Sequence, residues 1–303
     1  MKKSKALIFF LIIILIGTAV YSRDNLFKSF DYVGNKLKPG ILRIKSIGIK
    51  SNNLLNSKGL TIGERFKTPE GFERVEVPKD SFAEFLRNTA LKPDGTEVKY
   101  FDGREKPGKV YTAVLDIDVG DRDLQQCADA VMRLRSEYLY KMGAYDKIKF
   151  HFVSGFLADY KTWMNGYRIN VEGNNASWVK KTDFSNDYKS FRQYLDMVFA
   201  YAGTVSLEQE LKSVSVEDMQ IGDVFIKGSL PGHALVVVDM AYNKVSGEKL
   251  FMIAQSSTPA QDIHILKSTE NKDISPWYSL KFGDALSTPE WEFTRDQLRR
   301  FEN

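Results

Sequence analysis

Cysteine is almost absent from this chain of 303 residues, which contains only Cys127. A single cysteine cannot close an intramolecular disulfide, so no disulfide framework holds the fold. A lone thiol is either a buried core residue or a reactive group, and the composition leaves both alternatives open for Cys127.

The chain also lacks a strong charge of either sign and any dense basic stripe with interleaved aromatic residues. Its net charge is +4, spread along the sequence, so a nucleic-acid partner is not expected. With 43% hydrophobic and 27% charged residues, the composition is that of a globular protein. HExxH and paired Cys/His spacings are missing, so we expect neither a metal site nor a cofactor.

Long apolar runs are limited to one, which spans residues 6–20 and follows Lys2, Lys3 and Lys5. A run of this length behind a basic start is typical of a signal peptide and is short for a membrane span. We therefore expect residues 1–22 to be a signal peptide or an N-terminal membrane anchor. Either alternative predicts an extracytoplasmic protein, secreted or anchored, that contacts the membrane through this segment only.

The remaining chain divides into a polar spacer at residues 23–61 and a single globular domain at residues 62–303. Capping patterns at Ser81 and Asp123 predict the starts of two helices. Alternating or continuous apolar residues predict strands, and a 3.6-residue period predicts a third helix. The expected helices begin at 81, 123 and 188, and the main strands span 110–119, 148–153, 224–226, 234–240 and 250–254. Helices early and an antiparallel sheet late indicate the α+β class.

Cys127 lies in the first turn of the helix expected after Asp123. Exposed N–H groups and the helix dipole stabilise a thiolate there, which favours a nucleophilic role. Cys127 also shares a helical face with Val131, Leu134 and Tyr138, so the sequence equally permits a core position.

His233 follows a Gly-Pro loop and opens an apolar strand, a position that suits a general base held rigidly beside a thiol. The next expected strand ends at Gln255, which would lie beside His233 if the two strands form a hairpin. Asp239 is the alternative orienting group, although it is near the far end of the strand. A histidine at a strand start is also often a structural hydrogen-bonding residue.

This order of features resembles the papain-like amidases and peptidases of the NlpC and CHAP types, which act on bacterial cell-wall peptides. The Gln126-Cys127 pair, Gly222-Asp223 before a strand and Gly232-His233 at the next strand carry the resemblance. It implies a papain-like arrangement, with N-terminal helices packed on an antiparallel C-terminal sheet. It also implies Cys127 as nucleophile, His233 as base, Gln255 as orienting group and the Gln126 region as oxyanion donor.

The chain is also similar, from about residue 62 to 301, to the bacterial DUF4846 family, which has no assigned function. The similarity is carried by short runs distributed along the domain. They include Asp123–Ala130, Ala202–Thr204, Pro231–His233, Ala254–Ser256, Pro259–Asp262 and Thr288–Trp291.

Three further residues are candidates for substrate contact. Trp163 and Arg168 form an aromatic and basic cluster that would line a peptide or glycan groove, and ordinary packing is the alternative. His264 is a second candidate base or substrate contact, with a satisfied loop residue as the alternative.

Two function hypotheses follow. The first is a cell-envelope thiol hydrolase that cleaves an amide or peptide bond, in peptidoglycan peptides for example. The second is a non-catalytic extracytoplasmic module that binds a cell-wall peptide or glycan through the same groove.

Overall fold

The computed structural model describes residues 54–302. The expected signal peptide or anchor at 1–22 and nearly all of the expected spacer at 23–61 lie outside the described residues. Within residues 54–302, no helix combines the length and the hydropathy that crossing a membrane requires.

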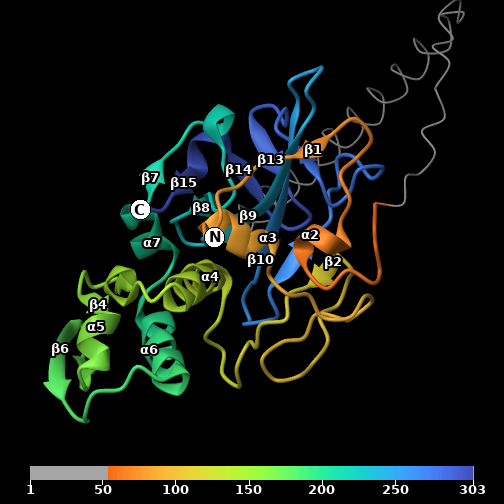
Figure 1. The fold of residues 1–303 in the computed structure, drawn as a ribbon. Helices are drawn as coiled ribbons and strands as arrows, with labels where there is room; N and C mark the ends of the chain where they lie inside the picture. The colour runs from red at the N-terminus through yellow and green to blue at the C-terminus, as the bar shows by residue number, and fades with distance from the viewer. Residues whose placement is uncertain (1–53, 303) are drawn as a thin grey trace, which may run out of the picture. The chain divides into compact units, whose positions relative to one another are not determined.

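A nine-stranded antiparallel sheet dominates this part of the chain (Figure 1). Seven strands follow one path in the order β2-β11-β10-β9-β8-β15-β7, while β1 pairs with β9 and β12 pairs with β10. The bounds are β1 Glu73–Arg74, β2 Tyr111–Val114, β7 Lys212–Ser213, β8 Val224–Lys227, β9 His233–Tyr242, β10 Lys249–Gln255, β11 His264–Leu266, β12 Tyr278–Ser279 and β15 Leu298–Arg300.

The centre of the sheet is the β9–β10 hairpin, which is buried along almost its whole length. Every residue of β9 from His233 to Ala241 is buried, as is every residue of β10 from Leu250 to Gln255. Continuous apolar runs of this kind are typical of strands covered on both faces. Helix α4 packs against both strands, and aromatic rings from β8, β10 and β14 pack together around Phe225.

The helices are few, and among the described residues only α4 and α6 exceed seven residues. Three small hairpins accompany them. The helices are α2 Ile62–Arg65, α3 Phe82–Arg87, α4 Cys127–Lys141, α5 Tyr160–Met164, α6 Tyr188–Tyr201 and α7 Thr204–Glu210, with 3-10 turns η1 Tyr145–Lys147, η2 Val216–Asp218 and η3 Arg295–Gln297. The hairpins join β3 Lys149–His151 to β4 Leu157–Asp159, β5 Tyr167–Glu172 to β6 Asn175–Lys180, and β13 Ala285–Ser287 to β14 Glu292–Thr294. Figure 1 shows α4 between the sheet and the segment that carries α5 and α6.

The expected papain-like α+β arrangement, with N-terminal helices packed on a C-terminal sheet, is wrong. The described chain is β-rich, and its nine-stranded sheet includes β1 near the start of the domain as well as β2, which lies within the strand expected at 110–119. Before α4 the described chain contributes only α2 and α3, and these have four and six residues. The physical reason is that β9 and β11 need backbone partners, which the early strands supply.

Local signals were more informative than the fold class. Ser81 is the N-cap of α3, and its Oγ accepts a hydrogen bond from the Glu84 N–H at 3.1 Å. Helix α6 begins at Tyr188 as expected. The expected strand at 110–119 is shorter, since β2 ends at Val114. Asp123 is not a cap, because α4 begins four residues later at Cys127.

Asp239 is a fully buried carboxylate in the middle of the sheet. Its two oxygens accept hydrogen bonds from Arg74 Nε and Arg87 Nε, each at 2.7 Å. Arg74 belongs to β1 and Arg87 to α3, so one carboxylate fastens both elements to β9. Asp239 therefore has a structural role and is not the group that orients His233.

Replacing Asp239 by Asn is expected to destabilise the protein by about 3 to 5 kcal/mol, because two half-buried guanidinium groups would lose their counter-charge. Urea unfolding followed by circular dichroism measures the change. Glu73→Gln is the matched control on β1, where Glu73 and Lys244 form an exposed pair and the cost should stay below about 1 kcal/mol. Equal effects of the two substitutions would show that the Asp239 cluster does not anchor the sheet.

Candidate functional site

Cys127 is the first residue of α4, and Gln126 is the N-cap. The Gln126 backbone N–H donates to Asp129 Oδ2 at 2.9 Å, so the first turn is closed by a carboxylate three residues into it. Asp123 instead accepts from the Ala260 N–H at 2.7 Å, which fastens the loop before α4 to the β10–β11 loop.

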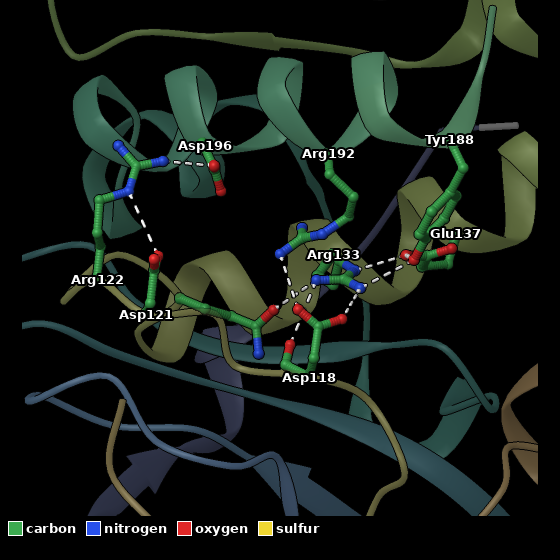
Figure 2. Close-up of polar contacts among 9 residues, drawn as sticks. Asp118, Asp121, Arg122, Arg133, Glu137, Tyr188, Arg192 and Asp196 are labelled. Atoms are coloured by element: carbon green, nitrogen blue, oxygen red, sulfur yellow. Dashed lines mark hydrogen bonds and ion pairs between the residues drawn. The ribbon is translucent and has the colours of Figure 1, made fainter. Parts of the chain in front are cut away.

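Arg133 of α4 is the centre of a group of polar contacts that includes Asp118, Glu137 and Tyr188 (Figure 2). Its side chain is 2% exposed, and its Nη1 and Nη2 donate to Gln125 Oε1 at 3.0 Å and to Asp118 Oδ1 at 3.1 Å. Glu137 and Tyr188 complete its shell. A buried charge with this many partners is satisfied, so Arg133 acts as a rigid fastening for residues 118–125.

The β10–β11 loop is also hydrogen-bonded to Gln125 and Gln126, the two residues that precede Cys127. Ser256 Oγ lies 3.0 Å from the Gln125 carbonyl oxygen and 2.8 Å from the Gln261 carbonyl oxygen, so its hydroxyl bridges the two segments. Thr258 Oγ1 donates to Gln126 Oε1 at 2.9 Å, and Gln126 Nε2 donates to Asp123 Oδ1 at 3.0 Å. Both ends of the Gln126 carboxamide are thus engaged within the protein.

His233 is the first residue of β9, and only 1% of its surface is exposed. Its ring stacks on Trp291 with centroids 4.7 Å apart and the planes parallel to within 1°. Its Nε2 lies 2.8 Å from Gln255 Oε1 at the end of β10. The hairpin therefore brings together the two residues that the sequence analysis paired.

Glu290 and Lys106 determine which way the Gln255 carboxamide points. Gln255 Nε2 donates to Glu290 Oε2 at 2.7 Å, and Lys106 Nζ donates to Glu290 Oε1 at 2.8 Å. The Lys106 ammonium and the Gln255 hydrogen bond hold the pKa of Glu290 below its usual range, against the effect of burial. An ionised carboxylate only accepts, so the amide nitrogen must face Glu290 and the amide oxygen must face His233.

The orientation of Gln255 in turn assigns the His233 tautomer. An amide oxygen only accepts hydrogen bonds, so His233 Nε2 carries the proton and Nδ1 is left with a lone pair. Among the described residues, Nδ1 has no hydrogen-bond partner. Burial lowers the pKa of His233 to about 4, so the ring is neutral at physiological pH.

His264 completes the cluster from β11 and is fully buried. Its Nδ1 donates to the Asp262 carbonyl oxygen at 2.8 Å, which leaves Nε2 as an acceptor 3.4 Å from Gln255 Nε2. Burial lowers the pKa of His264 to about 4 as well. His264 therefore receives the second N–H of Gln255, while His233 is bound to the carboxamide oxygen.

The Cys127 thiol lies near the first residues of β9, and the backbone N–H of Ala234 is close enough to favour the thiolate. Burial and then the nearby Asp129 carboxyl outweigh this effect and raise the pKa of Cys127. The helix N-terminus thus does not produce the activated thiolate that the sequence pattern favoured. No hydrogen bond between the sulfur and the His233 ring occurs in the described structure.

Cys127 is buried on the helix that also carries the core residues Val131 and Leu134. Its exposed fraction is 8%, against 1% for Val131 and 0% for Leu134. The backbone N–H groups that favour the thiolate belong to Cys127 and Ala128 in the first turn of α4 and to Ala234 of β9.

Trp163 and Arg168 do not join this cluster. Trp163 is buried in α5 and donates from Nε1 to Ser190 Oγ at 3.1 Å. The Arg168 guanidinium lies 4.1 Å from the centre of the Trp163 ring, and its Nη1 donates to the Trp163 carbonyl oxygen. These contacts form a packed unit between α5 and β5.

Four residues that shape the site were missed in the sequence analysis, namely Lys106, Arg133, Glu290 and Trp291. Glu290 and Trp291 both lie in the Thr288–Trp291 run, so they were visible as a motif without a role. Arg133 follows the Asp123–Ala130 run by three residues, and Lys106 carries no signal of its own. In residues 54–302, no group of three or more His, Cys, Asp and Glu side chains is arranged to hold a metal ion.

Stability is expected to fall as the pH decreases from 7 to 5, because His233 and His264 have folded pKa values near 4 against about 6.5 when unfolded. Between those values the unfolded chain binds protons that the native chain does not, so the stability is complete above pH 6.5 and is lost below it. Each ring should contribute about 2 kcal/mol of loss by pH 5.

Urea unfolding at a series of pH values measures this loss, and His264→Gln should remove about half of the slope between pH 6.5 and 5. His151→Gln is the control, because that ring is half exposed beside Glu210 and lies outside the cluster. An unchanged slope in His264→Gln would mean that the buried ring is protonated in the native state.

Comparison with known proteins identifies the family of the chain but assigns it no activity. No curated protein and no solved structure matches the chain, so the resemblance to NlpC and CHAP amidases gains no support there. One family profile, described as Domain of unknown function (4846), matches residues 62–300. Since this match covers most of the sequence, the chain belongs to the DUF4846 family.

Proposed function

We propose that the protein is a thiol hydrolase that cleaves an amide or peptide bond, with Cys127 as nucleophile and His233 as general base. The observation that carries the proposal is the Lys106–Glu290–Gln255–His233 series, which leaves an unprotonated Nδ1 on a rigid ring. That ring belongs to the residue just before Ala234, whose backbone N–H is close enough to the Cys127 thiol to favour its ionised form.

The catalytic pair starts from two neutral groups. The thiol has a raised pKa and His233 a lowered one, so proton transfer accompanies the attack instead of preceding it. The sulfur bonds to the substrate carbonyl carbon while His233 Nδ1 takes the thiol proton. The imidazolium then returns this proton to the departing amine, which leaves a thioester. A water molecule, deprotonated by Nδ1, hydrolyses the thioester and restores the thiol.

The surrounding residues have positioning roles in this scheme. Gln255 keeps the proton on Nε2 and stabilises the imidazolium, as the third member of a catalytic triad does. Trp291 prevents the ring from rotating, and Arg133 keeps the start of α4 in place. The N–H groups of the first turn of α4 are the donors available to an oxyanion on the substrate. Gln126 is not among these donors, since both its side chain and its backbone N–H are already hydrogen-bonded.

The proposed substrate is a cell-wall peptide, and the proposed location is outside the cytoplasm. Both rest on the basic and apolar N-terminal segment at residues 1–22. Alkaline phosphatase fused after residue 61 tests the location, because this reporter is active only after export. An inactive fusion that is made in normal amounts would place the domain in the cytoplasm and exclude the cell wall as substrate.

A second candidate function is a non-catalytic binding module with the same fold. The raised pKa of Cys127 favours it, because a resting thiolate is absent and the thiol makes no hydrogen bond to His233. Under this alternative the polar series serves only to satisfy the buried histidines.

Hydrolysis of peptidoglycan peptides by the full chain, followed by mass spectrometry, separates the two functions. Cys127→Ala is expected to abolish cleavage, and His233→Ala to reduce kcat/KM by about 100-fold or more. Gln255→Ala should cause a smaller loss, because His233 remains as the base but its proton is no longer held on Nε2. His151→Gln provides the control for an exposed histidine. Cleavage that survives Cys127→Ala would exclude the thiol mechanism.

The pH dependence of alkylation tests the pair without a known substrate. Iodoacetamide labelling of Cys127, read by intact mass, is expected to rise as the pH increases through about 4, where His233 becomes a base, and to rise again in alkaline solution. His233→Ala should lose the acidic rise and keep the alkaline one. Identical profiles for wild type and His233→Ala would favour the binding module.

A further inference from the structure

A pocket of about 690 Å³ lies where β3, α7 and residues 301–302 meet, and its lining does not include Cys127 or His233. Arg135, a buried residue of α4, is one of the residues that line this pocket. The other lining residues are Asp146, Lys147, Lys149, Phe150, His151, Phe152, Val153, Gly155, Leu157, Ser206, Gln209, Glu210, Phe301 and Glu302.

Arg135 is a buried cation without an anion. Its guanidinium lies 5.1 to 5.5 Å from the ring centres of Phe82, Tyr138 and Phe301, and the residue is 8% exposed. Within the described chain it has no ion pair and no hydrogen bond. Arg133, two residues earlier on the same helix, has a complete shell of partners, so the missing counter-charge is particular to Arg135.

Three aromatic faces can hold a guanidinium in place, but they do not use its five N–H donors. Burial lowers the pKa of Arg135, and no carboxylate opposes that effect. Desolvating a cation in this way is costly unless an anion is bound nearby. A guanidinium fork is suited to two parallel hydrogen bonds with a carboxylate or a phosphate.

The remaining charges of the pocket favour an anion too. Lys147 and Lys149 are exposed at its rim and form no ion pair within residues 54–302. Of the three carboxylates, Glu302 pairs with Lys212, whereas the partner of Glu210 is His151, which carries a charge only when it is protonated. Arg135, Lys147 and Lys149 therefore face the carboxylates of Asp146 and Glu210, which leaves an excess of one positive charge.

The pocket also offers an apolar surface. Val153 and Leu157 are 63% and 39% exposed at its edge, and Phe150 and Phe152 are buried behind them. Exposed aliphatic side chains next to a charged pocket provide a contact for the apolar part of a ligand.

We propose that this pocket binds a small amphipathic anion, whose carboxylate or phosphate pairs with Arg135 and whose apolar part covers Val153 and Leu157. The site is independent of the Cys127 cluster, so its failure would leave the thiol mechanism untouched.

Isothermal titration of the full chain with octanoate and with octyl phosphate tests the site, and octanamide serves as the uncharged control. Saturable binding of either anion in the millimolar range or tighter is expected, with octanamide at least about tenfold weaker. Tighter binding of octanoate would identify a carboxylate as the preferred ligand, and tighter binding of octyl phosphate would identify a phosphate. Equal binding of all three compounds, or of none, would overturn the proposal.

Variants connect the binding to Arg135. Arg135→Leu is expected to lower the affinity for the anion by about tenfold or more and to leave the affinity for octanamide unchanged. Lys149 is exposed, so Lys149→Gln does not disturb the three aromatic rings around Arg135. This variant therefore tests the pocket even if Arg135→Leu fails to fold, and its affinity for the anion should be a few-fold lower. Arg104→Gln, an exposed arginine outside the pocket, is the matched control. Unchanged affinity in Lys149→Gln and Arg135→Leu would overturn the assignment.

Discussion

The burial of β9 on both faces is the constraint on which the rest of the structure depends. A strand in that position can carry polar side chains only where a neighbouring element supplies a partner, since an unpaired polar group there costs about 1 to 3 kcal/mol. β9 carries two. Asp239 recruits Arg74 and Arg87, and His233 recruits Gln255. The first requirement fastens β1 and α3 to the sheet, and the second places a neutral imidazole at the strand's opening.

The second requirement extends beyond the hairpin. A carboxamide that gives its oxygen to His233 must still satisfy two N–H groups, and these are taken up by Glu290 and His264. Glu290 in turn needs Lys106 as a counter-charge. The series is therefore continuous from the surface to the centre of the sheet. Its arrangement is useful whether or not the thiol reacts, because it allows two histidines to be buried without charge.

The sequence contains enough information for the parts of the site that are local, and too little for those that depend on distant segments. The pairing of His233 with Gln255 follows from two apolar runs joined by a short turn, which permit few registers. Glu290 lies 35 residues beyond Gln255, in a turn without any periodic pattern. The prediction of the fold class was wrong for a related reason. β1, β7 and β12 have two residues each, and a strand of that length produces no alternation to detect.

The thiol shows why a motif cannot determine a pKa. A helix N-terminus and the Ala234 N–H both favour the thiolate, but the favourable field of a helix end is worth about 0.3 to 1 kcal/mol at exposed positions. Desolvation opposes it with a larger effect once the helix packs on the sheet. The helix that presents Cys127 is also the helix that buries it, so any activation must come from Nδ1 of His233 during the reaction. A protected thiol of this kind would be inert until a substrate carbonyl is held against it, which suits a protein whose single cysteine is expected in an oxidising compartment.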